Sequence, residues 1–351
     1  MKERTHVDYF DNLRLFACLA VIFMHTAAGP LRQPIDGSWY ATNFMTCLAF
    51  PAVPLFLMMS GYLLLTDEKT ADVSVLFRHR LPKLLVPFLF WNVAAILWTL
   101  HLEDNLTVTG FVAKTVNGLH EPVMVHFWYL YTLIALYVLS PFLYAAMQNL
   151  SKSAHVLVFS LICLVSVQAM GRALVPEPFD RLFQIDLLQK MQLLGGHLCT
   201  FLLGYYLGTS EKRVPNWLLC TIGALCLAVI TVGTWGLSKA TGTYDQTFQS
   251  QNAGFEVVLA ACIFLLFRQN CHRSLPRLLK PVVRLALPIY LSHNLFLSIA
   301  FSLGISVSSF GSILAVTALT FIVCFLGSLA ASYMEPLAYL VTGSAYCRKR
   351  S

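Results

Sequence analysis

Two polar residues, Arg14 and His25, interrupt the first apolar segment at a spacing that places them on one side of a helix. Eleven residues at 3.6 per turn return the side chain to within about 20° of its starting direction, about 16 Å along the axis. Such residues are costly in lipid, so their shared face is expected to line a protein interior or a water-filled cavity. An imidazole there can take a proton from a sugar hydroxyl near neutral pH, so we predict that His25 is catalytic. A buried histidine that hydrogen-bonds a neighbouring helix is the alternative.

Three cations, Arg78, Arg80 and Lys83, lie just before the third apolar segment. Arg80 and Lys83 are three residues apart, so they share a face if a helix begins here. Arginine binds phosphate through a planar fork and lysine as a point charge. Together with Arg14, these residues are candidates for binding an anionic donor. The alternative is that they anchor the chain against anionic lipid at the cytoplasmic surface.

The second apolar segment contains the run Ser60-Gly61-Tyr62. Small residues allow a helix or a ligand to approach closely. Ser60 and Tyr62 are therefore candidate donor-binding residues, and close helix packing is the alternative interpretation.

The start of the fourth apolar segment contains Glu121, His126 and Trp128. Glu121 is a candidate catalytic residue, whereas His126 and Trp128 are candidates for binding an extracytoplasmic sugar, with the indole stacking on the ring. Aromatic residues are also expected at a membrane interface for purely structural reasons. His293, in the ninth apolar segment, is a further candidate substrate-binding residue, and His197 is a weaker one.

The composition identifies a polytopic membrane protein. Hydrophobic residues make up 57% of the 351 residues and charged residues 12%, against about 25% charged in soluble proteins. Ten apolar segments are predicted to form transmembrane helices, so the expected fold is an all-α bundle in a single domain, residues 1–351. These segments are residues 13–30, 45–65, 84–101, 127–147, 154–171, 191–208, 216–237, 254–267, 286–303 and 312–334.

The distribution of cations predicts the orientation of this bundle. If the N-terminus is cytoplasmic, 18 of the 24 lysine and arginine residues fall in cytoplasmic segments. Ten helices then place both termini in the cytoplasm. The net charge of +7 is explained by this asymmetry, so we expect no nucleic-acid partner.

Several common functional motifs are missing from the sequence. There is no HExxH motif, no phosphate-binding loop, no GxSxG elbow and no GxGxxG fingerprint. ATP-driven transport by this chain alone is therefore not expected. The ten cysteines show no metal-ligand spacing, so no metal is expected either.

The combined motifs resemble the acyltransferase 3 family of membrane acyltransferases that modify bacterial surface polysaccharides. The family pattern of a basic residue, ten residues and a histidine is matched by Arg14 and His25. Its SGF/SGY element is matched by residues 60–62, and its RxxR element approximately by Arg80 with Lys83, which lacks the bidentate fork. The aromatic stretch at 126–129 and the run IYLSH at 289–293 resemble two further family elements.

Within the family, residues 11–14, the second segment and the run ending in YVLSPFL are most similar to stand-alone enzymes linked to O-acetylation of enterobacterial common antigen. A proposed O-succinyltransferase branch is a looser match. Many relatives carry an SGNH hydrolase-like domain, which this chain is expected to lack. The resemblance implies a multi-pass protein of the bacterial inner membrane.

The activity implied by the resemblance is transfer of an acetyl group from cytoplasmic acetyl-CoA to a glycan or lipid-linked glycan. His25 would act either as a base for direct attack or in relaying the acyl group through an acyl-enzyme. The competing hypothesis is a polysaccharide or metabolite transporter whose permeation path is lined by Arg14 and His25. The sequence leaves the acyl group, the glycan and a homodimeric assembly open.

Overall fold

The computed structural model describes residues 8–175, 196–249 and 254–343 of the chain. Within these residues all the secondary structure is helical, which confirms the predicted all-α class. The first part contains α1 (Asp8–Leu31), α2 (Gly37–Ala49), α3 (Ala52–Leu65), η1 (Glu68–Ala71), α4 (Val73–Val75), η2 (Leu76–Arg80), α5 (Leu81–Leu102), α6 (Val108–Asn117), η3 (Val125–Phe127), α7 (Trp128–Asn149) and α8 (Lys152–Leu174). The second part contains α10 (His197–Thr209), α11 (Asn216–Thr241), η6 (Thr247–Gln249), α12 (Gly254–Asn270), α13 (Lys280–Arg284), α14 (Ala286–Ser302), α15 (Phe310–Ala331) and α16 (Leu337–Thr342).

Seven helical stretches among the described residues are long and apolar enough to cross a membrane. They are Asp8–Leu31, Gly37–Leu65, Val73–Leu102, Val125–Asn149, Lys152–Leu174, Asn216–Thr241 and Phe310–Ala331. The apolar helix Ala286–Ser302 is shorter. The other two predicted spans correspond to α10, with 13 residues, and α12, with 17 residues, and residues 191–195 of the sixth lie outside the described residues. An integral membrane protein is supported, while ten spans and cytoplasmic termini stay predictions.

The second predicted span, residues 45–65, is divided into two helices and starts earlier in the structure, at Gly37. The helical hydrogen bonds of α2 end at Phe50, whose amide donates to the Thr46 carbonyl at 2.9 Å. Pro51 follows, and it has no amide hydrogen for the next bond and clashes with the preceding turn. The chain therefore bends here before α3 begins.

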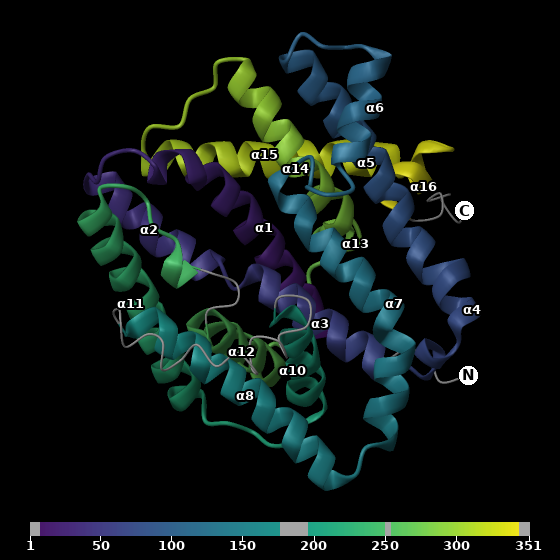
Figure 1. Ribbon diagram of the computed structural model, residues 1–351, viewed down its shortest axis with the longest axis vertical. Coiled ribbons are helices and arrows are strands. Elements are labelled where there is room, and N and C mark those ends of the chain that lie inside the picture. The colour runs from purple at the N-terminus through teal and green to yellow at the C-terminus, as the bar shows by residue number, and fades with distance from the viewer. Residues whose placement is uncertain (1–7, 176–195, 250–253, 344–351) are drawn as a thin grey trace.

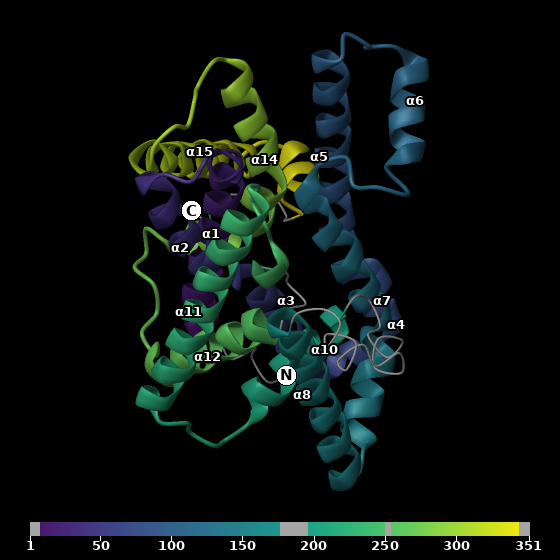
Figure 2. The same ribbon diagram turned by 60° about the vertical axis from the view of Figure 1, so that its left-hand side comes forward.

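Helix α1 lies at the centre of the bundle in both views (Figures 1 and 2). It contacts α2, α3, α12, α14 and α15, so it is covered on several sides by helices from both halves of the chain. Its buried residues are accordingly spread around the helix. A polar residue on α1 is thus presented to other helices, which positions His25 inside the protein.

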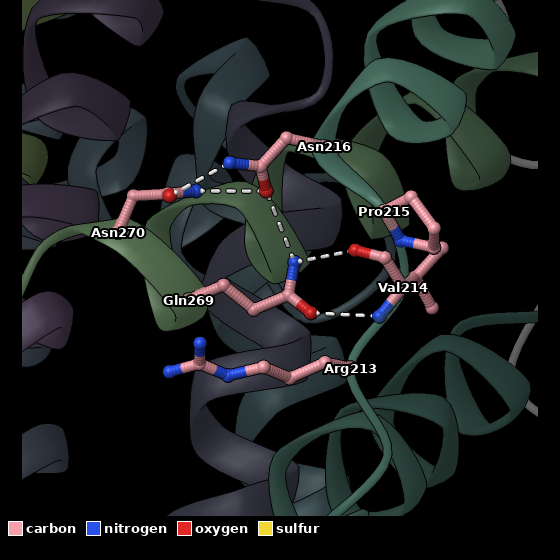
Figure 3. Close-up of a pocket in the computed structure, with 6 residues that line it drawn as sticks. All are labelled: Arg213, Val214, Pro215, Asn216, Gln269 and Asn270. Atoms are coloured by element: carbon pink, nitrogen blue, oxygen red, sulfur yellow. Dashed lines mark hydrogen bonds between the residues drawn. The ribbon is translucent and has the colours of Figure 1, made fainter.

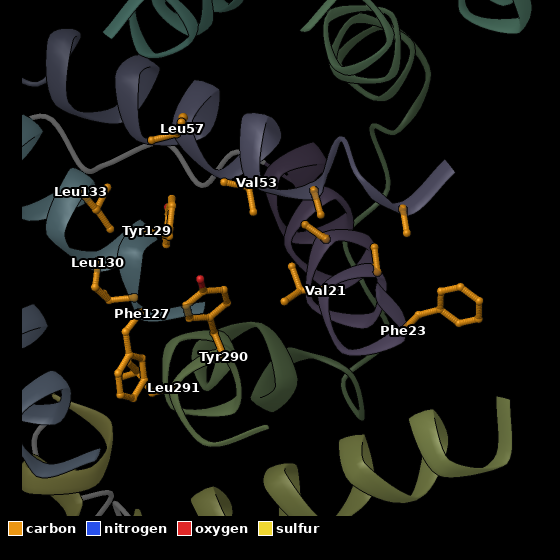
Figure 4. Packing of buried hydrophobic residues seen from close by; sticks show 14 of the residues in the cluster. Val21, Phe23, Val53, Leu57, Phe127, Tyr129, Leu130, Leu133, Tyr290 and Leu291 are labelled. Carbon is orange, nitrogen blue, oxygen red and sulfur yellow. The ribbon is translucent and has the colours of Figure 1, made fainter. Parts of the chain in front are cut away.

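Packing of α1, α3, α7 and α14 forms the largest apolar cluster (Figure 4). Val21 comes from α1, Val53 from α3, Leu130 from α7 and Leu291 from α14, and all four are nearly or completely buried. Side chains in such a core interdigitate at crystal-like density. The cluster therefore fixes α1 and α14 relative to the start of α7, where further histidines are located.

Helices α3 and α10 cross at close range because each contributes a glycine that lies against the backbone of the other helix. A Cβ on Gly61 would overlap the carbonyl of Phe201, and a Cβ on Gly204 would overlap the carbonyl of Met58. Small residues at helix contacts are a common means of close approach in membranes. This contact gives the Gly61 of the Ser-Gly-Tyr run a packing role.

The first prediction concerns this crossing. Gly204→Ala should lower the free energy of unfolding by about 1–3 kcal/mol, because the added methyl group must displace backbone atoms. Gly236→Ala in α11 is the matched control, since a Cβ there meets no atom within 4 Å. Thermal unfolding of the detergent-solubilised variants measures the difference, and equal midpoints would contradict the tight crossing.

Candidate active site

Three histidines from separate parts of the chain meet inside the bundle. The ring centroids of His25 and His293 are 5.1 Å apart, those of His126 and His293 4.5 Å, and those of His25 and His126 5.9 Å. His25 belongs to α1, His126 to η3 and His293 to α14. His126 and His293 are 2% and 0% exposed, whereas His25 is partly exposed. His25, a residue of intermediate exposure, therefore lies against two fully buried histidines.

The hydrogen bonds of His293 define which of its nitrogens is available. Its Nδ1 lies 2.5 Å from the carbonyl oxygen of Tyr290. A carbonyl can only accept, so Nδ1 carries the hydrogen and Nε2 is the basic nitrogen. Nε2 is buried and has no hydrogen-bond partner. His293 thus presents an unpaired proton acceptor inside the cluster.

His126 is held differently, because both of its nitrogens are engaged. Asn294 donates its amide to His126 Nδ1 at 3.3 Å, so Nδ1 is an acceptor, and His126 Nε2 donates to the carbonyl of Leu291 at 3.3 Å. The hydroxyl of Tyr290 donates to the His126 carbonyl at 2.6 Å. These contacts make His126 a fixed neutral group whose ring orients the cluster.

Arg14 lies toward the start of α1 and forms an ion pair with Asp11 at 3.3 Å. Its side chain is 31% exposed, and Tyr137 of α7 is close enough to interact with its charge. Sequence reasoning had overlooked Asp11, although its spacing of three residues from Arg14 was the available signal.

The predicted donor residues at the start of the third span do not share one environment. Arg80 donates to Asp67 at 2.7 Å and to the Thr70 hydroxyl at 2.5 Å, whereas Arg78 and Lys83 are exposed. Arg80 is the last residue of η2, a π-helical turn, and α5 begins at Leu81. Positions 80 and 83 lie on one continuous helical stretch, Val73–Leu102, but the Arg80 guanidinium is bonded at η1, whereas Lys83 is exposed.

The residues of the Ser-Gly-Tyr run contact other helices. The ring of Tyr62 lies 5.3 Å from that of Phe10 and fills the space beside Gly208 of α10. Ser60 is partly buried and lies beside the hydroxyl of Tyr129.

Of the residues predicted at the sugar side, His126 and His293 join the cluster, whereas Glu121 and Trp128 have other surroundings. Glu121 is exposed in the turn after α6, and no hydrogen bond or ion pair among the described residues joins it to the three histidines. Trp128 stacks on the ring of His197, with centroids 5.1 Å apart and an interplanar angle of 28°. One face of the Trp128 indole is thus covered in part by an imidazole.

Two cavities lie away from the histidine rings. One, of about 310 Å³, is lined by Arg213, Gln269 and neighbouring residues at the ends of α11 and α12, where the Gln269 amide bonds to both backbone groups of Val214 (Figure 3). The other, of about 470 Å³, adjoins the outer turn of α1 at Thr26 and Gly29 and the loop after α14. The second is the cavity nearest to His25 along the chain.

The three rings do not form a metal site. Among the described residues, no group of three or more histidine, cysteine, aspartate or glutamate side chains has the geometry to hold a metal ion. The cluster instead combines a histidine of intermediate exposure with an unpaired basic nitrogen, which suits proton transfer to and from a bound substrate.

Comparison with known protein families identifies the chain. The sequence model of a family described as an acyltransferase domain, acyltransferase 3, matches residues 7–330. The chain belongs to the acyltransferase 3 family. The region that matches the family model includes all three histidines.

Two curated proteins are similar to parts of this chain. Nodulation protein 10 of Rhizobium leguminosarum bv. viciae is 31% identical over 108 residues, which are 30% of this chain and 29% of that protein. Nodulation protein NolL of Sinorhizobium fredii (strain NBRC 101917 / NGR234) is 27% identical over 143 residues, 41% of this chain and 38% of that protein. The matches span well under half the length of each relative. No solved structure matches the chain.

The second prediction concerns the protonation of the histidine cluster. In protein labelled with ¹⁵N-histidine, NMR should show His293 with hydrogen on Nδ1 and His126 with hydrogen on Nε2. Asn294→Leu removes the donor to His126 Nδ1, so the His126 signals should shift. Asn270→Leu, at the end of α12, is the control and should leave them unchanged. A spectrum insensitive to Asn294→Leu would contradict the assigned hydrogen bond.

Proposed function

We propose that this acyltransferase 3 protein is a membrane O-acyltransferase that moves an acetyl group from cytoplasmic acetyl-CoA to a hydroxyl of a cell-surface polysaccharide or its lipid-linked precursor. The observation that carries the proposal is the unpaired Nε2 of His293 beside the ring of His25. An acyl transfer to an alcohol requires such a base, because a neutral hydroxyl is a weak nucleophile.

In the proposed reaction, His25 takes the proton of the acceptor hydroxyl as its oxygen attacks the thioester carbon. A new C–O bond forms, the C–S bond breaks, and the proton returns to the sulfur of coenzyme A. His293 Nε2 can accept a hydrogen bond from the other nitrogen of His25, which would stabilise the imidazolium formed in this step. An acyl-enzyme on a residue of the cluster is the alternative route.

The donor and the acceptor are assigned to different groups of residues. We assign the phosphates and pantetheine arm of acetyl-CoA to Arg14, Ser60, Tyr62, Arg78, Arg80 and Lys83. Glu121, His126, Trp128 and His293 are assigned to the acceptor side, with Glu121 as a second candidate catalytic group. The positive charges of the first group favour an anionic donor.

The finer identity rests on the sequence resemblance. We propose an enzyme of the enterobacterial common antigen O-acetyltransferase type in a bacterial inner membrane, acting without a metal. Succinyl transfer by the same site is the second candidate acyl chemistry. These two proposals specify which acyl donor and which acceptor bind. The proton transfer at the histidines would be the same for either acyl group.

The third prediction is that His25→Ala abolishes transfer while the protein still inserts and folds. Removal of a general base costs about 10²–10⁴-fold in rate. Purified protein in lipid nanodiscs is given labelled acetyl-CoA and a lipid-linked glycan fraction, and the label is followed by mass spectrometry. His155→Ala is the matched control, because His155 bonds to Tyr206 on helices that do not carry the cluster.

Each outcome bears on the assignment. Label in the glycan with wild type and His155→Ala, but not with His25→Ala, supports it. Normal transfer by His25→Ala would remove His25 from the mechanism. If wild type neither binds nor consumes acetyl-CoA or succinyl-CoA, the enzyme proposal fails and transport becomes the better hypothesis.

The fourth prediction separates donor binding by Arg80 from its contact with Asp67. Arg80→Gln should raise the KM for acetyl-CoA by about tenfold or more, because a charged hydrogen bond contributes about 1.5–3 kcal/mol. Asp67→Asn weakens the same ion pair but keeps the guanidinium, so its KM should change less. Equal effects of the two variants would show that Arg80 only holds the turn in place.

A further inference from the structure

A second buried polar cluster lies between α2, α11 and α12, apart from the three histidines. On α2, Asn43, Thr46 and Cys47 occupy one helix face and are each 2% exposed or less. On α11, Thr231 and Thr234 occupy one face, and the carbonyl of Thr231 accepts a bond from the Asn43 amide at 3.0 Å. Two helix faces that would be apolar in an ordinary core are therefore polar here.

The turn η6 closes this cluster. Gln249 is 1% exposed, and its amide nitrogen lies 3.2 Å from Asn43 Oδ1 and 3.1 Å from Cys47 Sγ. Tyr244 donates to the Gln249 side-chain oxygen. Phe248 packs against α11 at Gly233, where its ring occupies the place of a Cβ. The polar atoms beneath are thereby separated from solvent.

Glu256, in the first turn of α12, contributes a carboxyl group to this closed region. It is 0% exposed, and neither of its oxygens has a hydrogen-bond partner. The hydroxyl of Thr46 also lacks a partner, and those of Thr231 and Thr234 lie beside the Cys47 thiol. Cys47 is the common neighbour, because Gln249, Thr231, Thr234 and Glu256 all interact with it.

No cation among the described residues balances a charge on Glu256. The titratable groups that face it are the thiols of Cys47 from α2 and Cys226 from α11, and the phenol of Tyr244 before η6. No charged group on the other helices that pack against α12 acts on it. An isolated carboxylate in such a setting costs many kcal/mol, so proteins neutralise it.

We propose that Glu256 is a proton-binding site within the helical bundle. The carboxylate takes a proton from a hydronium ion, which leaves a water molecule, and the resulting acid has one O–H donor and one carbonyl acceptor. That pair matches the surrounding hydroxyls, each of which can both accept and donate. A proton also needs no extra volume, whereas an alkali ion requires several oxygen ligands at once.

The proposal is independent of acyl transfer, because the histidine cluster is formed by α1, η3 and α14. It also differs from a role in packing alone. A structural polar contact would leave Glu256 hydrogen-bonded to a neighbour, whereas both oxygens are unpaired here.

Infrared spectroscopy tests the proposal directly. Wild-type protein in a maltoside detergent, which has no carbonyl group, should show the C=O stretching band of a buried carboxylic acid at neutral pH, and the band should shift in D₂O. Glu256→Gln should lose the band, and Glu256→Asp should move it. Glu211→Gln, which changes an exposed carboxylate before α11, is the matched control and should retain it.

The same measurements can overturn the proposal. A wild-type spectrum at neutral pH without an acid band that depends on residue 256 would exclude a bound proton. Loss of the band when choline chloride is replaced by sodium chloride at constant pH would identify an alkali-ion site instead. If Glu256→Gln fails to fold, the shift caused by Glu256→Asp and the pH dependence of the wild-type band still decide between these results.

Discussion

The contact of three imidazoles determines how the centre of this protein must be built. Neutral imidazoles are costly in an apolar interior unless their nitrogens are matched, and one short stretch of α14 supplies nearly all the partners. The carbonyls of Tyr290 and Leu291 accept from two of the rings, and the Asn294 amide donates to one of them. Helix α1 and the turn η3 must therefore be held against this stretch, which the large apolar cluster accomplishes.

Two of the cationic residues are positioned by ion pairs and not by the apolar cluster. Arg14 and Arg80 each lie next to an aspartate, Asp11 and Asp67, so their guanidinium groups are positioned by the protein itself. An anionic ligand at either group must compete with, or add to, an existing ion pair. Such pre-positioned groups lose less conformational entropy when a ligand binds, although the carboxylate weakens the net attraction.

Composition and periodicity were sufficient to predict the all-helical class and the approximate positions of most long helices. The spacing of Arg14 and His25 singled out His25, and the element IYLSH singled out His293, two of the three histidines that meet in the structure. The contacts could not be predicted, because His25 and His293 are far apart in the chain and meet only through tertiary packing. Glu256 was overlooked, although an acidic residue inside an apolar segment is itself a signal of function. The break between α2 and α3 at Pro51 could also have been predicted, because proline disrupts a helix.

The π-helical turn at Leu76–Arg80 changes which side of the helix the residues before it occupy. A π turn contains one residue more than the matching stretch of α-helix, so it rotates everything before it by roughly 100° relative to α5. A helical wheel drawn continuously through this region therefore assigns the wrong side to every residue upstream. Alignments of relatives that lack the extra residue would need a one-residue gap here to keep their cationic side chains in register.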